Sequence, residues 1–163
     1  MEADDLLFYC DAGAVFIASA KPVLDLCRRK DTPVVVFSLE AEHRNRKWVK
    51  RDCFNYMEMD RQPYLDMPLI VGGYLVCRKT PFTVAFFEEW LALAEDPRLL
   101  TDAPNSCGLP NYPQFIAHRR DQSILSLLAR KHGIATVPDI SQWGNERRSP
   151  DLPQILALTR WSA

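Results

Sequence analysis

The sequence predicts an α/β fold, with a mixed, mostly parallel sheet flanked by helices. Continuous apolar runs rich in β-branched residues, such as 33–39, are typical of strands that are buried on both faces. Segments with helical spacing of apolar residues stand between these runs, and this alternation favours the α/β class. The 163 residues suffice for one domain with a real core. We expect that domain over 1–142, and a peripheral or mobile tail over 143–163, where charge and proline alternate.

Each element follows from a local signal. The apolar run 6–10 predicts a buried strand that ends at Asp11, and the glycine pair inside the expected strand 69–77 indicates a bulge or a close backbone approach. Proline near the first turn and glycine after the last turn mark helix boundaries, and 96–113 is read as a long loop. The remaining expected elements are a strand at 134–137 and helices at about 22–30, 48–57, 81–95 and 121–132.

Composition excludes several classes of protein. The formal net charge of −1 gives no field for binding nucleic acid. The five cysteines have neither zinc-site spacing nor an even number, so they indicate reduced packing residues. No apolar segment resembles a secretory signal or is long enough to span a membrane, and a cytoplasmic protein is therefore expected.

Two acidic positions are the strongest candidates for chemistry. Asp11 ends a predicted strand, where ligands of α/β sheets collect, and Gly13 would let a ligand approach the backbone. Asp121 and Gln122 open the helix at 121–132, whose start attracts anions. The alternatives are a turn at Asp11 and a helix N-cap at Asp121. Lone histidines such as His118 are usually local hydrogen-bonding residues, and Lys50 with Asp52 is read as a solvated pair.

Several short motifs follow one another along the chain. Their order is Asp11-Ala12-Gly13, Trp48 with Lys50 and Asp52, Gly72-Gly73, Arg78-Lys79-Thr80, Glu89-Trp90-Leu91, Thr101-Asp102, Pro104-Asn105 and His118-Arg119-Arg120-Asp121-Gln122-Ser123. This series resembles glycosyltransferases of the GT-A fold, in the group related to glycogenin-like and lipopolysaccharide galactosyltransferases. Their strand-ending Asp-x-Asp, small-residue strand and Asp-Gln helix start are similar to 11–13, 71–73 and 121–122 here, and the resemblance runs from about residue 6 to 137.

The resemblance implies transfer of a sugar from a nucleotide-sugar to a hydroxyl acceptor on a glycan, lipid or protein. Asp11 would hold Mn²⁺ or Mg²⁺ against the diphosphate. Asp121 would act as general base or acceptor anchor, and Gln122 would orient the sugar. The other residues implied are Gly13, Gly72, Gly73 and His118 on the donor side, and Asp102 and Asn105 on the acceptor side.

The chain departs from this family at two points. Gly13 stands where the second acid of Asp-x-Asp is usual. Such enzymes also carry a nucleotide-binding βαβ half before the motif, which here begins at residue 11. We therefore expect an acceptor-side fragment that binds nucleotide-sugar weakly and exposes apolar surface, which favours self-association.

Two other functions stay open. The first is an inactive remnant or partner-binding module. The second is an aspartyl-nucleophile phosphatase of the haloacid dehalogenase type, for which Asp11 and Ser38 would end two successive strands. Gly13 occupies the position of that enzyme's second acid, and no later Asp-Asp pair follows.

Overall fold

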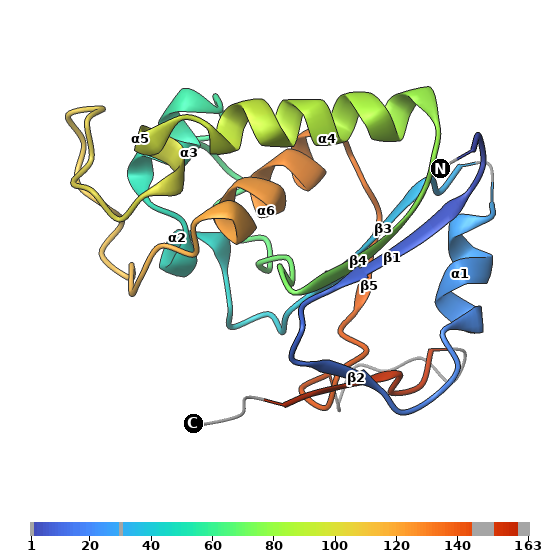
Figure 1. Ribbon diagram of the computed structural model, residues 1–163. Helices are drawn as coiled ribbons and strands as arrows, with labels where there is room; N and C mark the ends of the chain where they lie inside the picture. Colours follow the sequence, from blue (N-terminus) through green and yellow to red (C-terminus); the bar gives the residue numbers. More distant parts are fainter. Residues whose placement is uncertain (1, 30, 145–151, 160–163) are drawn as a thin grey trace.

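The computed structural model describes residues 2–29, 31–144 and 152–159. Its main sheet is mixed and has the strand order β1-β4-β3-β5. Strand β4 pairs antiparallel with both β1 and β3, and β3 pairs parallel with β5 (Figure 1). The four strands are β1 (Leu6–Cys10), β3 (Val34–Ser38), β4 (Tyr74–Arg78) and β5 (Thr136–Pro138).

The expectation of a mostly parallel sheet was wrong, although the α/β class and the mixed sheet are confirmed. Strands β1, β3 and β5 share one direction, and the single reversed strand β4 lies between β1 and β3. Apolar content predicts that a strand is buried but carries no information about its direction. Because β4 is reversed, its amino end meets the carboxyl ends of β1, β3 and β5 at one edge of the sheet.

Helices cover both faces of the sheet. In Figure 1, α4 and α6 lie on one side and α1 on the other. The helix α4 begins at Pro81, as the sequence predicts, and Thr80 and Thr83 form a reciprocal capping box that was not predicted. The helices are α1 (Lys21–Cys27), α2 (Asn45–Trp48), α3 (Arg51–Tyr56), α4 (Pro81–Ala94), α5 (Pro97–Leu100) and α6 (Asp121–Lys131).

The core is divided by the sheet into two clusters. Successive residues of β3 alternate between them: Val34 and Val36 pack with the cluster that includes α6, whereas Val35 and Phe37 pack with the one that includes α1. All five residues of β3 are buried, as expected for a strand covered on both sides. Among the described residues, no helix is both long and apolar enough to cross a lipid bilayer.

Two local expectations need correction. The helix expected at 48–57 is divided, because Val49 and Lys50 are extended between α2 and α3. Part of the chain after Gln142 is not peripheral: β6 (Leu156–Leu158) pairs antiparallel with β2 (Ala14–Phe16), and Ile155 and Leu156 are fully buried. The rest of that expected tail, 145–151 and 160–163, lies outside the described residues.

Candidate functional site

A cleft of about 760 Å³ opens at the sheet edge where β1 ends and β4 begins. Five of the residues selected from the sequence line it: Asp11, Gly13, Gly72, Gly73 and Gln122. Among the described residues of the lining, Asp11 is the only one with a charged side chain. The remaining lining residues are Leu39, Val71, Trp143, Leu158 and Thr159.

The carboxylate of Asp11 is held by its neighbours. Tyr9 donates its hydroxyl to Asp11 Oδ1 at 2.7 Å, and the Asp11 amide donates to the carbonyl of Gly73 at 2.8 Å. The hydrogen bond to Asp11, followed by burial and by the charges of Asp11 and Asp121, raises the pKa of Tyr9 to about 12. Tyr9 therefore stays a neutral donor at physiological pH, and Asp11 Oδ2 accepts no hydrogen bond from a described residue.

The glycines of the cleft allow close approach, as the sequence predicts, but the approaching groups belong to the chain itself. A Cβ on Gly72 would lie 2.8 Å from the Cβ of Gln122, and one on Gly73 would lie 3.1 Å from Asp11 Oδ2. A Cβ on Gly13 would lie 2.8 Å from the carbonyl oxygen of Thr159. These three positions are therefore small because helix α6, Asp11 and the segment after β6 pack against them.

The start of α6 is strained and presents a carboxylate without a partner. Arg120 is the N-cap, with φ 52° and ψ −124°, and its side chain makes no capping bond. Asp121 is instead the first residue of the helix, which corrects the interpretation of Asp121 as the cap. Its carboxylate is exposed and makes no hydrogen bond or ion pair with any described residue. Strain of this kind is concentrated at functional sites.

Asp121 lines a second, smaller pocket of about 190 Å³ next to the cleft. The two pockets share Gly72, and Tyr9 lines the second pocket while its hydroxyl contacts Asp11. The indole N–H of Trp90 donates to the carbonyl of Asp121 at 3.3 Å and so holds the start of α6 against α4. Tyr9 thus contacts Asp11 and lines the same pocket as Asp121.

Buried polar residues of α6 fix this helix to the sheet edge. The Gln122 amide donates to the carbonyl of Ile70 at 2.8 Å. Ser123 donates to the carbonyl of Trp48 at 2.8 Å, and Ser126 donates to Asn45 at 2.7 Å. No role was predicted for Ser123 or Ser126; serines three positions apart within an apolar helix face were the available signal.

The other predicted residues, His118, Asp102 and Asn105, line a third pocket of about 350 Å³ that shares no lining residue with the other two. His118 Nδ1 accepts the backbone N–H of Lys50 at 3.3 Å, so Nε2 carries the proton and donates to the carbonyl of Leu99 at 2.8 Å. Burial lowers the pKa of His118. Both ring nitrogens are hydrogen-bonded to backbone groups, so the neutral imidazole of His118 connects segments of the protein itself.

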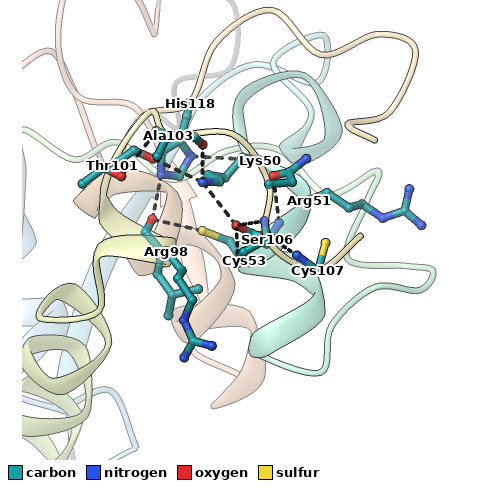
Figure 2. A network of polar contacts seen from close by, with 12 residues as sticks. Lys50, Arg51, Cys53, Arg98, Thr101, Ala103, Ser106, Cys107 and His118 are labelled. Atoms are coloured by element: carbon teal, nitrogen blue, oxygen red, sulfur yellow. Dashed lines mark hydrogen bonds and ion pairs between the residues drawn. The ribbon is translucent and has the colours of Figure 1, made fainter. Parts of the chain in front are cut away.

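Lys50 and Asp52 form a buried ion pair, so their expected solvent exposure was wrong. Their side chains are 3% and 0% exposed. Figure 2 shows Lys50 together with Ala103, Ser106 and Cys107 of the loop that carries this third pocket. The ammonium of Lys50 donates to the carbonyl of Ala103 at 2.7 Å, and Asp52 accepts the backbone N–H groups of Ser106 and Cys107, each at 2.9 Å. The pair therefore orders the loop.

Asp102 and Asn105 are also engaged within the loop region. Asp102 forms an exposed ion pair with Arg120 at 3.0 Å, next to the start of α6. The amide nitrogen of Asn105 donates to Asn111 at 2.9 Å and to the carbonyl of Leu109 at 3.1 Å. These contacts connect the third pocket to Asp121 through Arg120.

The cleft does not fit a divalent cation. Mg²⁺ and Mn²⁺ prefer several oxygen ligands, with carboxylates foremost. The lining offers the single carboxylate of Asp11, and the described part of the chain contains no group of three or more His, Cys, Asp or Glu side chains that could hold a metal. The expected Mn²⁺ or Mg²⁺ therefore enters no step proposed below. A haloacid dehalogenase-type phosphatase also needs further acidic residues beside Asp11, and the described lining of the cleft offers none.

No family model matches this chain, and no curated protein or solved structure is significantly similar to it. The case for any function therefore depends on the geometry of the cleft and of the pocket beside it.

Proposed function

We propose that the cleft and the pocket beside it form the sugar-transfer site of a glycosyltransferase, in which a sugar passes from a nucleotide-sugar to a hydroxyl acceptor. The observation that carries this proposal is the convergence of Asp11, Gln122 and the unpartnered Asp121 around Gly72 and Tyr9. These residues come from a strand end, a glycine turn and a helix start that are far apart in the sequence. A purely structural convergence would not require a carboxylate without a partner.

The sugar of the donor would lie in the larger cleft. Carboxylate and amide groups are good partners for sugar hydroxyls, because a carboxylate accepts only and an amide both donates and accepts. Asp11 Oδ2 would accept a sugar hydroxyl, while Tyr9 fixes the other oxygen at 2.7 Å. Gln122 would contact a second hydroxyl through Oε1, because its amide nitrogen already donates to Ile70.

The acceptor hydroxyl would approach from the pocket that Asp121 lines, across Gly72. In the transfer step its oxygen forms a bond to the anomeric carbon, and the bond from that carbon to the diphosphate oxygen breaks. The hydroxyl proton passes to the Asp121 carboxylate, which acts as general base. The electron pair of the broken bond leaves with the nucleoside diphosphate. The Asp121 carboxylate is exposed, and no described residue forms a hydrogen bond or ion pair with it that would compete for this proton.

The experiment combines binding with turnover on the intact chain. UDP- and GDP-sugars are titrated by isothermal calorimetry and by amide chemical-shift mapping, and transfer or hydrolysis is followed by release of the nucleoside diphosphate. We expect weak, millimolar binding with shifts at Gly72, Gly73 and Gln122. Asp121→Asn should keep binding and lower turnover at least 100-fold.

Asp31→Asn is the matched control, because it removes another exposed carboxylate from a pocket that shares no lining residue with the cleft or with the pocket of Asp121. It should leave binding in the cleft unchanged. Shifts confined to residues outside the two pockets, or full turnover by Asp121→Asn, would refute the proposal.

A partner-binding module is the second candidate, and a separate groove favours it. This groove, of about 480 Å³, lies between β1 and α4 and is lined by Leu7, Val84, Phe87 and Leu91 among others. Leu7 is 43% and Leu91 61% exposed. Adjacent exposed apolar residues of this kind are typical of interaction surfaces.

A further inference from the structure

Trp143 presents an exposed indole to the cleft. Its side chain is 67% exposed, the highest value among the exposed large hydrophobic residues that the structure describes. It lines the same cleft as Asp11 and Gln122, and it follows β5 at the sheet edge where β1 ends. No role for Trp143 was predicted from the sequence.

The backbone around Trp143 is held from below by buried polar groups. The Ser141 amide donates to Asp139 at 2.7 Å, and the Trp143 amide donates to the Ser141 hydroxyl at 3.2 Å. Asp139 also accepts the hydroxyl of the fully buried Tyr74. A Cβ on Gly144 would lie 1.9 Å from the carbonyl oxygen of Asp139, so the turn closes tightly after the tryptophan. The turn that carries Trp143 is therefore held in place, and its indole is exposed to solvent.

An aromatic side chain carried by a fixed turn, beside a few polar groups, is a partly preorganised binding surface. The backbone that carries the ring is in place before a ligand arrives, so less conformational entropy is lost on binding. An indole offers a broad apolar face, and the other groups of the cleft, Asp11 and Gln122, offer hydrogen-bonding partners. Pyranose rings match this combination, because one face carries C–H groups and the rim carries hydroxyls.

Charge favours a neutral group beside Asp11. Among the described lining residues Asp11 is the only charged one, so a phosphate directly against its carboxylate would be repelled, and the diphosphate of a nucleotide-sugar would lie on the side of the ring away from Asp11. A neutral, hydroxyl-rich ring meets no such repulsion and supplies donors for Asp11 Oδ2. A nucleobase could also stack on the indole, and UDP and GDP are therefore included as probes in the test below.

We infer that Trp143 is the stacking platform for a hexopyranose ring whose hydroxyls bind Asp11 and Gln122. The inference rests on the proposed function only in identifying this ring as the sugar of the donor. Saccharide binding by itself can be measured without turnover. Trp143 then determines specificity for one face of the ring, while Asp121 in the adjacent pocket takes part in transfer.

The test uses methyl glycosides of galactose, glucose and mannose, with UDP and GDP as nucleotide probes, titrated by chemical-shift mapping of the whole chain. We expect at least one glycoside to bind with millimolar affinity. Trp143→Ala should weaken that binding at least tenfold, whereas Trp143→Phe, which keeps an aromatic face, should weaken it less than fivefold. Leu91→Ala is the control, since Leu91 is 61% exposed in a different groove.

The outcomes test saccharide binding at Trp143 separately from sugar transfer. Equal glycoside affinity of Trp143→Ala and the unaltered chain would overturn the inference, as would no glycoside binding up to 100 mM. Loss of UDP binding with glycoside binding retained in Trp143→Ala would overturn the choice of a sugar ring. Trp143-dependent glycoside binding without any turnover of nucleotide-sugars would support the inference and refute the transferase.

Discussion

Gly72 and Gln122 are packed so closely that a Cβ on the glycine would lie 2.8 Å from the Cβ of the glutamine. This contact joins the turn before β4 to the first turn of α6. The Gln122 amide continues the connection by donating to the carbonyl of Ile70 at 2.8 Å. The position of the helix start, and with it Asp121, therefore depends on the absence of a side chain at residue 72.

Gly72→Ala should lower the free energy of unfolding by about 1–3 kcal/mol, because an added methyl group in a packed region forces side chains and backbone to shift. The neighbouring atoms are Cβ and Cγ of Gln122, which cannot move away without moving the helix. In the double variant, Gln122→Gly should restore part of this loss, less about 1 kcal/mol for placing glycine in a helix. Urea unfolding of the two single variants and the double variant measures this; additive losses would contradict the contact.

Arg120→Gly should stabilise the chain by about 1 kcal/mol, because glycine adopts a positive φ without the strain that a side chain incurs. The φ of Arg120 is 52°. Arg120→Ala is the control: it also removes the exposed pair with Asp102 but keeps the strain. Thermal unfolding should rank glycine above alanine, and the reverse order would show that this backbone is not strained.

Asp52→Asn should lower the free energy of unfolding by about 3–5 kcal/mol, because it leaves the ammonium of Lys50 buried without its counter-ion. Asp102→Asn, in an exposed pair, should cost less than about 1 kcal/mol. Urea unfolding at pH 7 compares them, and equal losses would contradict the difference in burial.

The Asp52 carboxylate should also make the free energy of unfolding sensitive to acid. Burial alone raises the pKa of Asp52, but the N–H groups of Ser106 and Cys107 and the ammonium of Lys50 outweigh it and lower the pKa from 3.8 to about 2. Because the folded pKa is the lower one, this contribution to stability is present above pH 3.8 and is lost as the pH falls through about 2. Stability measured between pH 4 and pH 2 should fall less steeply in Asp52→Asn than in the unaltered chain.

Tyr9 should ionise near pH 12, and Asp11→Asn should bring that value closer to 10, because the hydrogen bond to Asp11 is the largest cause of the shift. Since the folded pKa is raised, the stabilisation is present below pH 10 and is lost as the pH rises through about 12. Carbon-13 labelling of tyrosine rings resolves the titration, and Tyr9→Phe assigns it. An unchanged Tyr9 titration in Asp11→Asn would argue against the contact.

Self-association, expected from the sequence, should occur through the groove between β1 and α4. Leu91→Lys would place a charge beside Leu7 and Phe87 and should shift the chain toward monomer. Ile116→Lys is the matched control, because Ile116 is also 61% exposed but lies outside this groove. Sedimentation velocity over a range of concentrations measures the effect; equal behaviour of both variants would exclude this surface.

The sequence predicted the buried elements better than their arrangement. A continuous apolar run correctly indicated β3, and apolar residues at helical spacing correctly indicated α6, because burial leaves a direct compositional signal. The reversed direction of β4 leaves no such signal. Strand β6 was missed because charge and proline before it suggested a peripheral tail, although the apolar run 155–158 was present.

The candidate site was predicted in part for the same physical reason. A strand end and a helix start can be read locally, and these indicated Asp11 and Gln122, which line one cleft. The close approach at Gly72 was also indicated, but its partner lies 50 residues further along the chain. Trp143 could not be recognised because its exposure depends on a turn held by Tyr74 and Asp139.

Because β4 is reversed, segments that are far apart in the sequence line the same cleft. Residues 11, 72, 122 and 143 all line it, so a bound molecule would contact segments from the first tenth to the last quarter of the sequence. Such a ligand would bind only when all of these segments are folded together. Binding would then be linked to unfolding of the whole domain, and a ligand at one hundred times its Kd would raise the free energy of unfolding by about 2.7 kcal/mol. Saturating the cleft with ligand would therefore slow amide exchange in the slowest-exchanging strands of the sheet.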